Sequence, residues 1–186
     1  MSTYKIAAIC GSLRKSSTNL ALLNKSVELT ADKFQISFVD ISQFPVYNMD
    51  IDTPELFPEC IKVARQQILD ADGILVGLPE FNFSMPGSFK NAIDWLSRGT
   101  IGNHPFQCKP VCVVSSAGGL GGYRAQQHFR QIGQFFDLRF MPNDLTVRQF
   151  EPPQKFNEGG LIDAATIDKL KTHLDDFHKW IEFQKH

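Results

Sequence analysis

Hydrophobic residues along the chain fall into two alternating patterns, short continuous apolar runs and longer stretches with helical spacing. The runs predict strands at 4–10, 34–40, 73–78 and 110–116, and a weaker strand near 138–147. The stretches with helical spacing predict helices near 18–30, 55–70, 87–97, 121–136 and 163–184. Near-continuous apolar strands separated by helices are typical of a parallel sheet that is covered on both faces. The predicted fold class is therefore α/β, with a doubly wound sheet.

The last predicted helix carries one apolar stripe at 3,4,3,4 spacing, which favours a structural role against the sheet. The stripe consists of Ile167, Leu170, Leu174, Phe177 and Ile181. The chain has no internal repeat and no linker, and the proline-rich segments at 42–54 and 150–159 are typical of surface loops. We expect a single domain over residues 1–186.

The charge balance narrows the range of partners. With 42% hydrophobic residues, 21% charged residues and a formal net charge of −1, the chain has no basic excess that would favour nucleic acid or an anionic membrane. It also has no secretory signal pattern and no run approaching the roughly 20 apolar residues of a membrane span. A small or neutral ligand and a cytoplasmic location are the expectation.

The four cysteines are typical of reduced thiols, because two of them lie inside apolar runs. They stand at 10, 60, 108 and 112. His104, Cys108 and Cys112 are spaced by four, which raises the alternative of a zinc site. No fourth ligand follows the pattern and Cys112 lies within a predicted strand, so we predict no metal.

Three loops after predicted strands carry the candidate chemistry, because ligands of open α/β sheets bind at the carboxyl ends of the strands. The first loop is "GSLRKSSTN" at 11–19, between a strand and a helix. Its backbone amides and the positive helix end favour an anion, its hydroxyls add neutral donors, and Arg14 offers a fork of N–H groups. This composition predicts a terminal-phosphate site, while the spacing fits neither the Walker loop nor the three-glycine dinucleotide fingerprint. The alternative is that these residues only form turns and a helix cap, with Thr18 or Asn19 starting the helix.

The second loop, "PEFNFSMPG" at 79–87, contains two prolines and a glycine that prevent regular structure. Asn82, Ser84 and two aromatic rings suit a flat ligand with an apolar rim and a hydrogen-bonding edge. The alternative is that one or two of Phe81, Phe83 and Met85 only seal the core.

The third loop, "SSAGGLGGYR" at 115–124, has four glycines that let the backbone approach a ligand closely, although they also suit a simple turn. One ligand answers all three loops, because flavin mononucleotide (FMN) combines a monophosphate with a planar heteroaromatic ring. We expect FMN as the cofactor.

The same three segments resemble the NAD(P)H-dependent FMN reductase family of flavodoxin-like proteins, in particular the subgroup that reduces quinones, chromate and azo compounds. The resemblance runs from about Ile6 to the last helix and implies a five-stranded parallel sheet of order 2-1-3-4-5. It implies phosphate contacts from Ser12, Arg14, Ser17 and Asn19, a ring border at 80–83, and completion of the site by Ser116 and Gly118. The full set of candidate FMN-binding residues is Ser12, Arg14, Ser17, Thr18, Asn19, Leu20, Pro79, Glu80, Phe81, Asn82, Phe83, Ser115, Ser116 and Gly118.

The resemblance also implies a mechanism, in which NADPH or NADH reduces the flavin and leaves before a small-molecule acceptor binds. No catalytic side chain is assigned, and Glu80 is interpreted as a loop residue. Phe81 departs from the family, which usually has tyrosine there. Family members commonly form dimers or tetramers, and Trp95, Tyr123 and Arg124 are candidate contacts, with Trp95 equally plausible in the core.

Two alternatives remain beside this hypothesis. A flavodoxin-like electron carrier would bind FMN without NAD(P)H turnover, but such carriers are typically strongly acidic and this chain is not. A phosphate-binding regulatory module would leave the aromatic loop at 79–87 unexplained. The residues do not decide between NADH and NADPH, and they do not name the physiological acceptor.

Overall fold

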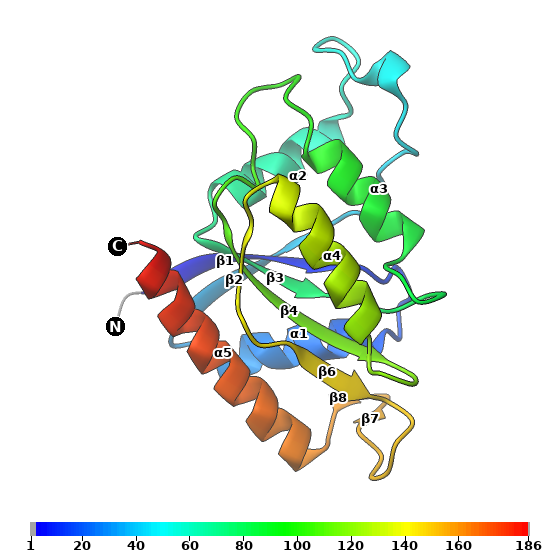
Figure 1. The fold of residues 1–186 in the computed structure, drawn as a ribbon, viewed down its shortest axis with the longest axis vertical. Coiled ribbons are helices and arrows are strands. Elements are labelled where there is room, and N and C mark those ends of the chain that lie inside the picture. The colour runs from blue at the N-terminus through cyan, green and yellow to red at the C-terminus, as the bar shows by residue number, and fades with distance from the viewer. Residues whose placement is uncertain (1–2, 186) are drawn as a thin grey trace.

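The computed structural model of the chain describes residues 3–185. Its central sheet has the order β2-β1-β3-β4-β5 with every pairing parallel, which confirms the predicted doubly wound fold (Figure 1). These strands are β1 (Tyr4–Cys10), β2 (Phe34–Val39), β3 (Gly73–Gly77), β4 (Pro110–Ala117) and β5 (Arg139–Phe140). A further strand, β6 (Leu145–Arg148), pairs with the second half of β4.

Helices cover both faces of the sheet and form two hydrophobic cores (Figure 1). The helices are α1 (Thr18–Leu29), α2 (Glu59–Leu69), α3 (Gly87–Leu96), α4 (Tyr123–Phe135) and α5 (Ala164–Gln184), with a 3-10 turn η1 (Met49–Ile51). One core joins the sheet to α2, α3 and α4 through residues such as Ile61, Phe89 and Phe129. The other joins it to α1 and α5 through Leu22 and Leu174.

Two predicted elements differ from the structure at prolines. The helix predicted from 55 begins at Glu59, directly after Pro58, which has extended backbone angles. The strand predicted near 138–147 is two segments, β5 and β6, separated by a turn that contains Pro142. The loop predicted at 150–159 also contains part of a small hairpin, formed by β7 (Phe156–Asn157) and β8 (Gly160–Leu161).

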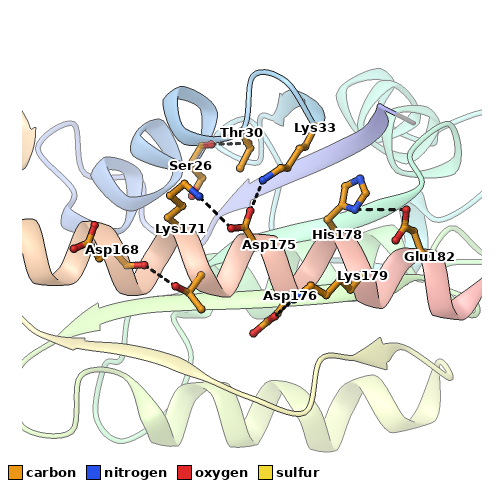
Figure 2. Close-up of polar contacts among 11 residues, drawn as sticks. Ser26, Thr30, Lys33, Asp168, Lys171, Asp175, Asp176, His178, Lys179 and Glu182 are labelled. Carbon is orange, nitrogen blue, oxygen red and sulfur yellow. Dashed lines mark hydrogen bonds and ion pairs between the residues drawn. The ribbon is translucent and has the colours of Figure 1, made fainter. Parts of the chain in front are cut away.

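The last helix packs by its predicted stripe, since Leu170, Leu174, Phe177 and Ile181 are fully buried. On its polar face, Asp175 pairs with Lys33, which lies between α1 and β2, and with Lys171 of α5 itself (Figure 2). Lys33, the nearer partner, holds the pKa of Asp175 below its usual value. Residues 3–185 include no helix that is long and apolar enough to cross a membrane.

Candidate functional site

The loops after β1 and β3 meet closely at the carboxyl end of the sheet. Gly11 N donates a hydrogen bond of 2.8 Å to Gly77 O. A Cβ atom at Gly11 would lie 3.1 Å from Pro79 Cδ and 3.3 Å from Leu78 Cδ1. The single glycine of the first loop therefore permits this approach.

The first loop presents hydrogen-bond donors at the N-terminus of α1. Ser17 Oγ accepts from Leu20 N at 3.3 Å, and Ser12 Oγ accepts from Arg14 N at 3.3 Å. Neither of these two contacts uses the proton of the hydroxyl itself. The exposed Arg14 uses one guanidinium nitrogen to donate to Ser16 O at 2.9 Å. The helix cap considered for this loop is present: the helix starts at Thr18, one of the two predicted starts, and Ser17 caps it.

Asn19 joins the first loop to the end of β4. Its Nδ2 donates to Ser116 O and its Oδ1 accepts from Ser116 N, both at 2.8 Å, and the side chain is buried. The structure thus gives Asn19 a positioning role, since both ends of its amide are engaged. Ser116 Oγ is itself buried and has no hydrogen-bond partner within the described part of the chain. An unpaired buried hydroxyl is costly unless a ligand or water completes it.

The second loop forms a tight hairpin turn. Phe81 and Ser84 exchange two backbone hydrogen bonds of 2.9 Å. Between them, Asn82 and Phe83 have φ of 49° and 64°, a left-handed conformation that is uncommon for a residue as bulky as phenylalanine. Such strain persists only where surrounding contacts impose it.

Helix α4 supplies those contacts. Glu80 Oε2 accepts from Arg124 N at 3.0 Å, which places a carboxylate at the helix N-terminus. The Arg124 guanidinium lies 4.0 Å from the centre of the Phe83 ring. Ser84 Oγ and His128 Nδ1 are 2.9 Å apart. Phe81 and Phe83 remain 58% and 65% exposed, while Met85 joins the core as one alternative predicted.

The third loop turns through Gly121 and Gly122, both with positive φ. A Cβ at Gly122 would lie 2.6 Å from Ser115 Oγ, so a side chain does not fit there. Ser115 Oγ donates to Gly121 O and accepts from Gln126 Nε2, each at 2.7 Å. Ser115 therefore fixes the turn, and both of its hydrogen bonds are internal.

Together the three loops line a cavity of about 220 Å³, named here the loop cavity. Ten predicted residues line it: Ser12, Arg14, Ser17, Thr18, Asn19, Pro79, Glu80, Phe81, Ser116 and Gly118. The other four, Leu20, Asn82, Phe83 and Ser115, lie outside its lining.

Two further residues line the loop cavity without having been predicted, Ala117 and Gln149. Gln149 Oε1 accepts from Thr18 Oγ1 at 3.1 Å. Gln149 directly follows β6, and ligands of such sheets bind at the ends of strands. This rule could have identified Gln149 if the strand predicted near 138–147 had been divided into β5 and β6.

Two cysteine thiols of the central sheet have raised pKa values. Burial raises the pKa of the Cys10 thiol, although contacts from Ser12 and Ser17 oppose the shift. Desolvation strongly raises the pKa of Cys112, which lies in the middle of β4. Within residues 3–185 no group of three or more His, Cys, Asp or Glu side chains is arranged to hold a metal ion.

Comparison with known proteins identifies the family of this chain. The model of one protein family, described as NADPH-dependent FMN reductase, matches residues 4–152. The chain belongs to that family. The NADPH:quinone oxidoreductase of Arabidopsis thaliana is 42% identical over 175 residues, which cover 91% of this chain and 88% of that protein. The quinone reductase of Escherichia coli K12 is 35% identical over 184 residues, covering 96% and 95%.

Solved structures also resemble this FMN reductase family member. FerB, a flavoenzyme NAD(P)H:(acceptor) oxidoreductase from Paracoccus denitrificans, has a TM-score of 0.87 and 28% identity, covering 98% of this chain and 99% of that one. An apo NADH:FMN oxidoreductase, EMOB, has a TM-score of 0.71 at 18% identity over 95% and 89% of the two chains, which shows a shared fold alone.

Proposed function

We propose that this family member is an FMN-dependent oxidoreductase that uses NADPH or NADH to reduce quinones, azo compounds, flavins or similar small acceptors. Family membership and the quinone reductases among its relatives support the proposal. The observation that carries it is the loop cavity, where three segments far apart in the sequence bring together ten residues expected to bind one cofactor.

The residues of the loop cavity fit FMN. Ser12, Ser17 and Arg14 offer donors to a phosphate at the N-terminus of α1. The buried Ser116 Oγ lacks a partner within residues 3–185, and a ligand atom with a free lone pair would complete it. Phe81 and Gly118 offer an apolar edge and an open backbone for a ring.

The chemistry that FMN supplies when bound is acceptance of a hydride from NAD(P)H and its delivery to a quinone, which also takes up a proton to become a hydroquinone. The chain itself binds and orients. The loop cavity of about 220 Å³ is smaller than the roughly 300–1,000 Å³ of sites that enclose a drug-sized ligand, so it would not enclose FMN completely. We infer that the ring is the part that stays accessible to a second planar molecule. Glu80 is engaged by Arg124 N, which agrees with assigning it no role as a catalytic acid.

The wider setting is proposed as well. We expect one flavodoxin-like FMN-binding domain, assembled as a homodimer or homotetramer in the cytoplasm. Tyr123, which is 47% exposed, and Arg124 stay candidates for subunit contacts. Trp95 does not, because it is fully buried and donates to Pro45 O at 2.8 Å. All four cysteines are free thiols, as a reducing compartment would keep them.

Steady-state kinetics with FMN-loaded protein test the enzyme. Oxidation of NADPH or NADH with varied quinone should give parallel double-reciprocal lines, because donor and acceptor take turns at one open site. Intersecting lines would contradict a shared site. Failure to bind added FMN, at about one per chain, would overturn the whole proposal.

A further inference from the structure

A second cavity of about 180 Å³ lies against the outer side of the first loop. It is named here the hairpin cavity, because the β7–β8 hairpin forms one wall and the exposed side of α1 forms the other. Figure 1 shows β7 and β8 beside the end of β6, the strand that Gln149 of the loop cavity follows. Ser17 and Thr18 line both cavities, so a single layer of the chain separates them.

The lining of the hairpin cavity suits a flat, neutral, hydrogen-bonding ligand. Phe156 provides a half-buried aromatic ring from the hairpin. Asn24 of α1 and Asn157 of the hairpin provide amides. Asn157 Oδ1 already accepts from Gly159 N at 2.8 Å, which fixes the side chain and leaves its Nδ2 as a donor. Aromatic stacking combined with amide donors and acceptors is the chemistry that recognises a purine base.

The balanced charges of the lining favour the neutral part of a nucleotide over its phosphate groups. The charged residues of the lining are two lysines and two glutamates, Lys15, Lys25, Glu28 and Glu158, and Lys25 pairs with Glu28. A formally neutral lining gives little attraction to a phosphate group. The volume is also below that of sites that enclose a whole drug-sized ligand, so the hairpin cavity suits one end of a longer molecule.

We propose that the hairpin cavity binds the adenosine half of the nicotinamide donor. The inference rests on the proposed function, which places the nicotinamide ring against a flavin in the neighbouring loop cavity. A dinucleotide has a flexible pyrophosphate between its two rings, and the shared wall of Ser17 and Thr18 keeps the two cavities within one such ligand. Because adenosine is common to NADH and NADPH, this contact serves both donors.

The test compares whole donors with a donor that lacks adenosine. FMN-loaded wild type, Phe156→Ala and Asn24→Leu are mixed with NADPH, NADH and reduced nicotinamide mononucleotide, and flavin reduction is followed against donor concentration. Loss of stacking should raise the half-saturating concentration of both dinucleotides at least about fivefold in Phe156→Ala. The mononucleotide should be unaffected. Phe135→Ala, which removes an 87% exposed ring at the end of α4, is the matched control and should behave as wild type.

Equal losses for the dinucleotides and the mononucleotide, or no loss for any donor, would overturn the inference. Asn24 lies on the exposed side of α1, so Asn24→Leu keeps the test decisive if Phe156→Ala does not fold. Calorimetric titration with ADP-ribose gives a readout that is independent of flavin reduction, and its binding should weaken in both variants. Wild type that no donor reduces would contradict the proposed function instead, and the titration would still decide the adenosine site.

Discussion

At the scale of single residues, adjacent or similar side chains have opposite tasks. Ser115 Oγ makes two internal hydrogen bonds, whereas Ser116 Oγ is buried with none inside the described chain. Both ends of the Asn19 amide hydrogen-bond to the backbone of Ser116, whereas Arg14 lies at the surface with one internal hydrogen bond. The unengaged groups are the ones that we assign to the ligand.

Arg14→Ala should weaken FMN binding by about 1–3 kcal/mol, because a charge-assisted contact to the phosphate is lost. Riboflavin, which has no phosphate, should bind the variant as it binds wild type. Fluorescence titration with both ligands measures the difference, with Arg139→Ala as a control away from the loop cavity. Equal losses for the two ligands would place Arg14 away from the phosphate.

Ser116→Ala should leave the apo protein as stable as wild type or slightly more stable, since it removes an unpaired buried hydroxyl. The same change should weaken FMN binding by about 0.5–1.5 kcal/mol. Ser115→Ala should instead destabilise the apo protein by about 1–3 kcal/mol, because Gly121 O loses its donor from Ser115 Oγ and Gln126 Nε2 loses one of its two acceptors. Urea unfolding and FMN titration of both variants separate the two roles, and the opposite order of stabilities would contradict them.

At the scale of elements, the sequence predicted the strand and helix order, and the structure shows why. Long periodic segments such as 18–30 and 163–184 have strong patterns, and caps at Ser17 and Asp163 fix their starts. The division of the predicted strand near 138–147 into β5 and β6 was not predicted, because each strand is short and the segment between them contains Pro142. Asn82 and Phe83, which were predicted to border the ring, lie outside the lining of the loop cavity, in a left-handed turn that no local spacing reveals.

The hairpin of the second loop depends on its anchor at α4. In Glu80→Ala the carboxylate that accepts from Arg124 N is lost, and the strained turn at Asn82 and Phe83 should open more often. Hydrogen exchange of the Phe81 and Ser84 amides, which bond across the turn, should then accelerate severalfold. Exchange at the core amides of β3 is the internal reference. Unchanged exchange at Phe81 and Ser84 would show that Glu80 is not the anchor.

At the scale of the whole molecule, stability should fall with acid in two stages. Burial lowers the pKa of His104 and His173 below the ordinary 6.5, so the unfolded chain takes up their protons first as the pH falls. Lysine partners likewise hold the pKa of Asp72 and Asp175 below 3.8. Stability from the histidines is therefore lost below about pH 6.5, and that from the carboxylates below about pH 3.8. Urea unfolding from pH 8 to pH 3 measures the free energy of unfolding through both stages. Asp175→Asn should make its fall less steep in the second stage only.

The central claim is that this chain reduces its own bound flavin with NAD(P)H. Anaerobic stopped-flow mixing of the FMN-loaded protein with NADPH or NADH alone tests it most directly. The account predicts that the flavin absorbance bleaches at a rate no slower than turnover and returns when a quinone is added. A flavin that stays oxidised under excess NADH and excess NADPH, yet accepts electrons from a separate reductase, would contradict the account and identify an electron carrier.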